Sequence, residues 1–141
     1  MTDSFGLEPL FTTNLFLWIV IGVLSAMFFL ASTLKIFAWN KKMFARQIEF
    51  LAVYGLNRKV FFLIGVVELF GSLAIWFQGH YLGLLGGGAI ALTSAGAIFY
   101  HFRFDPIRVA LPAIVTLTLS GLIVLHNIDH IWAYLVVAAA T

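Results

Sequence analysis

The sequence of 141 residues contains no cysteine and few charged side chains. The absence of cysteine excludes disulfide bonds, zinc–thiolate sites, iron–sulfur clusters and thiol chemistry. Asp, Glu, Lys and Arg make up 10% of the chain, whereas an average soluble domain has roughly 25%. The eight Lys and Arg residues are too few for a nucleic-acid-binding patch, so no nucleic-acid partner is predicted.

Hydrophobic residues, in contrast, make up 62% of the chain, and 15 of them are Phe. A soluble protein of this length could not bury that much apolar surface, and a disordered chain would be less hydrophobic and more charged. We therefore expect a single integral membrane domain over residues 1–141, with the lipid bilayer as its first partner.

Four apolar stretches are long enough to cross a hydrocarbon core of about 30 Å as helices. They lack the alternation of polar and apolar residues that is typical of barrel strands, so the predicted fold is all-α, a transmembrane four-helix bundle. The expected spans are 15–34, 60–77, 81–102 and 109–125.

The basic residues predict the orientation of these spans. All eight lie between the first and second spans or between the third and fourth, which place them on one side of the membrane: Lys35, Lys41, Lys42, Arg46, Arg58, Lys59, Arg103 and Arg108. Because positive loops stay in the cytoplasm, both termini are expected outside.

The first connection has a pattern of its own. From Ile36 to Tyr54, apolar residues recur every three or four positions with basic residues between them, which is typical of an amphipathic helix in the membrane interface. Gly55 is expected to end this helix as a C-terminal cap. It is either an ordinary connector or a site for anionic lipid head groups.

Small residues follow one face of the third span, at Gly83, Gly87, Ala91 and Ala95. A four-residue spacing of small side chains lets a neighbouring helix approach closely. This face is expected to pack inside the bundle, with dimerisation as the alternative.

Glu68 is the one acidic residue inside a predicted span. An acidic side chain near the bilayer centre costs roughly 3 kcal/mol, so it should face the bundle interior. Ser94 and Thr118 lie at a similar depth, and Lys35 either reaches Glu68 with its long side chain or extends to the membrane interface. Glu68 is thus either a proton-accepting or ligand-anchoring group, or a clamp that fixes the helix register.

His101 and Arg103 end the third span and are candidates to join Lys35 and Glu68 in a polar pocket in the inner half of the bundle. The alternative is that both simply anchor the helix at the membrane interface.

On the opposite side, His126 and His130 are four residues apart, and His80 lies in the outer turn. Imidazoles are ligands for zinc, copper, iron or haem, but interfacial histidines without metal are equally consistent with this spacing, and no metal site is assigned.

Several of these residues also resemble the motifs of the DoxX-like family of small four-helix membrane proteins. The similarity runs from Phe28 to Pro112 and rests on Lys35-Ile36, Tyr54-Gly55-Leu56, the segment 65–71 around Glu68, and the segment 101–106. The glycine expected before Lys35 and the proline expected at position 57 are absent.

The resemblance implies a bacterial inner-membrane protein, with Lys35, Glu68, His101 and Arg103 as the polar residues that match the family. Some relatives are linked to quinone-coupled oxidation or to oxidative stress. Two functions are therefore expected: a redox-associated protein that binds a quinone or another amphipathic molecule, or a non-catalytic accessory subunit of a larger membrane complex. An outward-facing metal or haem site is the third hypothesis.

Overall fold

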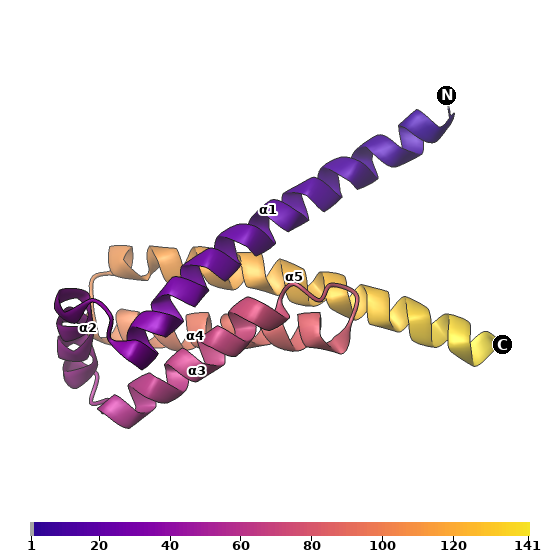
Figure 1. Ribbon diagram of the computed structural model, residues 1–141. Helices are drawn as coiled ribbons and strands as arrows, with labels where there is room; N and C mark the ends of the chain where they lie inside the picture. The colour runs from indigo at the N-terminus through magenta and orange to yellow at the C-terminus, as the bar shows by residue number, and fades with distance from the viewer. Residues whose placement is uncertain (1) are drawn as a thin grey trace.

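A computed structural model describes residues 2–141, with side chains described from Leu15 onward. Over that range the chain is helical, with short connections and no strand (Figure 1). The helices are α1 (Thr2–Phe37), α2 (Lys41–Val53), α3 (Arg58–Ala74), α4 (Tyr81–Phe104) and α5 (Ile107–Ala140).

Three segments are long and apolar enough to cross a membrane: Leu15–Phe37 of α1, the whole of α4, and α5. Helix α3 has 17 residues and meets α2 at a bend of 115°, so these two helices supply a fourth span only if the bent pair counts as one. The all-helical prediction is confirmed, and the apolar helices are compatible with a multi-pass membrane protein.

Helix α2 lies within the segment 36–54 where a helix was predicted, although it begins only at Lys41 because α1 continues to Phe37. Asn40 caps its start, with the side-chain oxygen accepting from the Met43 amide at 3.2 Å. Gly55, in the left-handed region with a φ of 75°, follows its end. Helix α3 starts in the same way, with the Asn57 side chain accepting from the Val60 amide at 3.0 Å.

Helix α5 continues without a break to Ala140, beyond Leu125, where the fourth span was predicted to end. The buried Asn127 side chain in this helix has its hydrogen bonds made, and its nitrogen donates to the Ile123 carbonyl of α5 at 2.9 Å. Its oxygen accepts from the Gly79 amide at 2.8 Å, and its nitrogen donates to Gln78 at 3.0 Å.

Helix α4 packs most extensively on α5 and also on α3, whereas α3 packs on α1, and α1 contacts α5 only slightly. Glycines allow the close approach: a Cβ at Gly86 would lie under 3.0 Å from the backbone nitrogen of Ile75, and one at Gly83 equally close to the Phe77 carbonyl. The predicted small-residue face is therefore only partly inside, with Gly83 and Gly87 buried and Ala95 exposed.

The two termini lie at one end of the helices, and α2 lies with the α4–α5 connection at the other (Figure 1). The buried apolar core lies toward the same end of the helices as the termini. It comprises Val20, Ile21, Leu24, Ile75, Ile90 and Ile123. The polar groups described next lie toward α2.

Candidate functional site

The predicted contact between Lys35 and Glu68 is present. Lys35, in the last turn of α1, donates to Glu68 Oε2 at 2.6 Å, and both side chains are largely buried. Gly65, one turn before Glu68, brings the helices together, since a Cβ there would lie 3.0 Å from the Lys35 Cβ. The Lys35 ammonium group compensates the negative charge that makes an acidic side chain costly in an apolar span.

A second polar cluster joins α2 to the end of α4 and consists of Tyr54, His101 and Asp105. The Tyr54 hydroxyl donates to Asp105 Oδ2, and His101 Nδ1 lies 2.8 Å from the same oxygen. The Tyr54 ring also stacks on Tyr100 and Phe104, with centroids 5.3 and 5.4 Å away.

The two hydrogen bonds, first from Tyr54 and then from His101, lower the pKa of Asp105. Burial, and next the hydrogen bond to Asp105, raises the pKa of Tyr54. Tyr54 is therefore a protonated donor and Asp105 an ionised acceptor at neutral pH. Because an ionised carboxylate only accepts hydrogen bonds, we assign a proton to His101 Nδ1.

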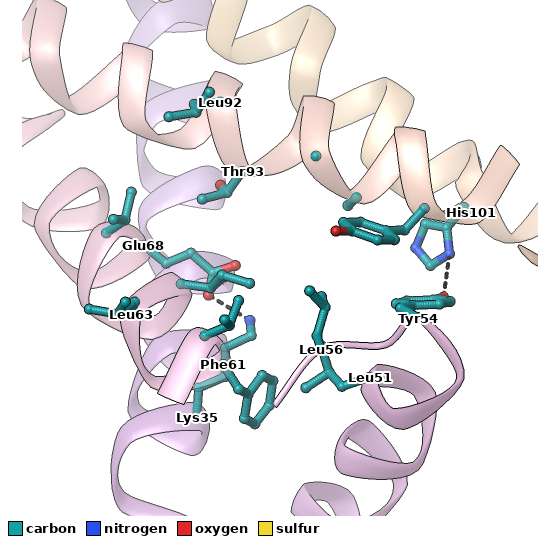
Figure 2. Close-up of a pocket in the computed structure, with 16 residues that line it drawn as sticks. Lys35, Leu51, Tyr54, Leu56, Phe61, Leu63, Glu68, Leu92, Thr93 and His101 are labelled. Atoms are coloured by element: carbon teal, nitrogen blue, oxygen red, sulfur yellow. Dashed lines mark hydrogen bonds and ion pairs between the residues drawn. The ribbon is translucent and has the colours of Figure 1, made fainter. Parts of the chain in front are cut away.

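A pocket of about 490 Å³ separates the two polar groups (Figure 2). Lys35 and Glu68 lie at one end of it, and Tyr54 and His101 at the other (Figure 2). The walls between them are mostly apolar and include Leu51, Leu56, Phe61, Leu63 and Leu92. An apolar cavity with a few converging polar groups is the usual form of a small-molecule site.

A second pocket of about 330 Å³ lies on the side of α1 and α5. It shares Glu68 and His101 with the first pocket, as well as Thr93 and Ala97 of α4. Ser94 also lines it, but the Ser94 hydroxyl bonds Thr116 of α5 at 2.8 Å and not the Glu68 carboxylate.

Two predicted site residues lie elsewhere. Thr118 is exposed, and its hydroxyl donates to the Ile114 carbonyl of its own helix at 2.9 Å. At about 100° per residue along α5, the inward face falls at Thr116, two residues before Thr118. Arg103 is exposed with its guanidinium 5.6 Å from the Phe104 ring centre, and it lines neither pocket.

The outer histidines do not form a three-ligand site. The rings of His126 and His130 lie 4.5 Å apart, and His80 is the exposed N-cap residue of α4. Among residues 15–141, whose side chains the structure describes, no group of three or more His, Asp or Glu is arranged to hold a metal ion.

Sequence reasoning missed Tyr54 as a pocket residue and Asn127 as a structural one. Tyr54 stands at the end of the amphipathic segment, directly before the predicted Gly55 cap, so its position at a helix junction was visible. Asn127 lies between His126 and His130 in the sequence, and its fully buried amide needs the partners described above.

Comparisons with known proteins identify no relative: no protein-family model matches the chain, and neither a curated protein nor a solved structure matches it.

Proposed function

We propose that this chain is a DoxX-like protein of the bacterial inner membrane, in which α1, α3, α4 and α5 form a transmembrane four-helix bundle and α2 lies in the cytoplasmic interface. The distribution of charge supports this topology, because all eight Lys and Arg residues fall between Lys35 and Lys59 or at Arg103 and Arg108. With these segments in the cytoplasm, both termini are outside.

We further propose that the pocket between the Lys35–Glu68 pair and Tyr54 binds a quinone or a similar amphipathic molecule. A quinone carbonyl oxygen accepts hydrogen bonds, and the pocket has spare donors at the Lys35 end. Lys35 has three N–H groups, of which one bonds Glu68. At the other end, the Tyr54 hydroxyl donates its one proton to Asp105, so that end offers the Tyr54 and Tyr100 rings as a wall for the quinone ring.

The open side of the same pocket suits an isoprenoid tail. Leu63 and Leu92, on α3 and α4, line the pocket and are 60% and 70% exposed, so they face lipid in the proposed bundle. A tail that leaves between them remains in the apolar phase. A bound quinone takes up two electrons and two protons on reduction, which is the proposed link to membrane redox processes.

Quinone content of the purified protein tests this proposal. The protein would be isolated in lipid nanodiscs, and its quinone quantified by mass spectrometry after organic extraction. Gly96→Leu fills the pocket from α4, where an added Cβ meets nothing within 4 Å. We expect about a tenfold lower ratio of quinone to protein, on the scale of about 1.4 kcal/mol in binding free energy.

Gly88→Leu is the matched control, because an added Cβ at Gly88 also meets nothing within 4 Å and the residue does not line the pocket. Its quinone ratio should equal that of the unmodified protein. A protein that carries no quinone from a quinone-containing membrane, or a Gly96→Leu variant that carries the normal amount, would contradict the proposal.

The length of α5 favours a second candidate, an accessory subunit of a larger membrane complex. At 1.5 Å per residue, its 34 residues extend about 51 Å, well beyond a hydrocarbon core of about 30 Å. Its last turns are exposed, including Trp132 at 68% and Tyr134 at 75%. Native mass spectrometry of mildly solubilised membranes tests this role, and a stable lone chain counts against it.

A further inference from the structure

The second pocket, between α1 and α5, has a polar surface of the opposite kind to the first. Glu68 is 6% exposed and lines both pockets. Its Oε2 atom bonds Lys35, whereas Oε1 receives no hydrogen bond from any side chain or backbone group in the described part of the chain. Because Glu68 lines this pocket, its second carboxylate oxygen is available to a donor that enters the pocket.

The hydroxyl groups of this pocket supply no donor of their own. Thr116 donates to the Ala113 carbonyl at 3.1 Å, so Ser94 donates to the Thr116 oxygen at 2.8 Å. Thr93 donates within α4, at 3.0 Å to a carbonyl one turn earlier. All three protons are therefore in use, and what these groups still offer is lone pairs.

The remaining wall is apolar and opens toward lipid in the proposed bundle. Ala31 of α1, Ala97 of α4 and Ala113 of α5 line the pocket, and their small side chains leave the volume unfilled. Pro112 lies beside Ala113, and the contact between α1 and α5 is slight. An elongated apolar molecule can enter here with its polar end toward Glu68.

The charge of Lys35 decides which donor fits. Its ammonium group lies 2.6 Å from the Glu68 carboxylate and already compensates the negative charge. A cationic ligand at Oε1 would add a second positive charge at the same carboxylate in an apolar environment, which is unfavourable. A neutral hydroxyl donates a proton without adding charge.

We infer that the second pocket binds an amphipathic alcohol, whose hydroxyl donates to Glu68 Oε1 and whose apolar body lies between α1 and α5. This inference stands on the second pocket alone. If the first pocket holds a quinone, the Lys35 N–H groups in that pocket favour a molecule with carbonyl oxygens. The acceptors in the second pocket favour a molecule with a hydroxyl group, and Glu68 lies between the two pockets.

Photolabelling of the full-length protein in lipid vesicles tests this inference. The probe is a diazirine-bearing dodecanol, and its methyl ether is the matched compound without the O–H donor. After irradiation, peptide mass spectrometry locates the labels. We expect the alcohol to label 109–116 of α5 and 27–31 of α1 about tenfold more than the ether, which is the effect of one hydrogen bond to a charged acceptor.

Four variants locate the binding site. Ala113→Phe fills the second pocket and should reduce alcohol labelling about tenfold, with Val109→Phe as a second filler from the same helix. Leu111→Phe lies on the exposed face of α5 and should leave labelling unchanged. Gly96→Leu should also leave it unchanged, since Gly96 lines only the first pocket.

Equal labelling by alcohol and ether would overturn the inference, as would full labelling of a folded pocket-filled variant. Either result would leave the quinone proposal standing, because quinone content is measured separately and depends on Gly96. Loss of quinone binding alone would equally leave the alcohol site intact.

Discussion

The same four helices form a sealed half near the termini and a pocket half near α2. In the sealed half, α4 meets the backbone at the end of α3 at Gly86 and the backbone of the following connection at Gly83, and Ile90 is fully buried. In the pocket half, a Cβ at Gly96 of α4 would meet nothing within 4 Å.

The polar groups differ in the same way. In the sealed half, the Asn127 side chain has a partner for both its oxygen and its nitrogen. In the pocket half, Glu68 keeps one oxygen without a partner and Lys35 keeps N–H groups to spare. A buried polar side chain with all its hydrogen bonds made stabilises the fold. A ligand, in contrast, requires spare donors and acceptors that line an open pocket.

The largest effect on stability is expected for the Lys35–Glu68 ion pair of the pocket half. Lys35→Met leaves a buried Glu68 carboxylate without its cation and should lower the free energy of unfolding by about 4 kcal/mol. The double variant Lys35→Met/Glu68→Gln removes both charges and should regain more than half of that loss. Reversible unfolding in mixed micelles measures both, and a double variant no better than the single one would contradict the pairing.

The next effect tests the close packing of the sealed half. Gly86→Ala places a methyl group against the Ile75 backbone and should lower the free energy of unfolding by about 3 kcal/mol. Gly88→Ala has space and should be neutral or slightly stabilising, since alanine favours a helix. The same unfolding assay applies, and similar values for the two variants would show that the contact does not limit packing.

A smaller loss is expected at the turn between α3 and α4. Asn127→Ala leaves the Gly79 amide without its acceptor and Gln78 Oε1 without its donor, and should cost about 2 kcal/mol. Asp129→Ala, at an exposed position on the same helix, is the control and should be close to neutral. Amide hydrogen exchange at Gly79 reports the effect locally and should become faster only in the Asn127 variant.

The smallest effect is a change in pH dependence. Because the pKa of Asp105 is lowered, its contribution is fully present above the ordinary value of about 3.9 and is lost as the pH falls below it. Because the pKa of Tyr54 is raised, its contribution is present below about 10 and is lost as the pH rises further.

Tyr54→Phe should therefore reduce the acid loss of stability and remove the part of the alkaline loss that Tyr54 causes. The unfolding temperature of the variant and of the unmodified protein, measured from about pH 3 to about pH 11, reports this change, because the range includes the ordinary pKa values of Asp and Tyr. Tyr134→Phe, at a tyrosine that is 75% exposed, should retain the normal profile. An unchanged profile in the Tyr54 variant would exclude the cluster as the source.

The candidate site was partly predictable. Glu68 in an apolar span was expected to face the bundle interior, and Lys35 was a candidate partner, with extension to the membrane interface as its alternative; the structure shows the contact. The choice between Thr116 and Thr118 was not predictable, because both are hydroxyls at similar depth and only the rotation of α5 against α4 separates them.

The chain's composition by itself determined an all-helical, lipid-compatible class, and periodicity with glycine placement determined helix α2 and its end at Gly55. These features depend on local spacing and on the cost of polar groups in apolar surroundings. Only the tertiary structure decided that Tyr54 closes the pocket, that Arg103 and Thr118 turn outward, and that α5 continues past Asn127. Those outcomes depend on contacts between residues about 50 positions apart, such as Tyr54 with Asp105 and Gly79 with Asn127, which no local pattern contains.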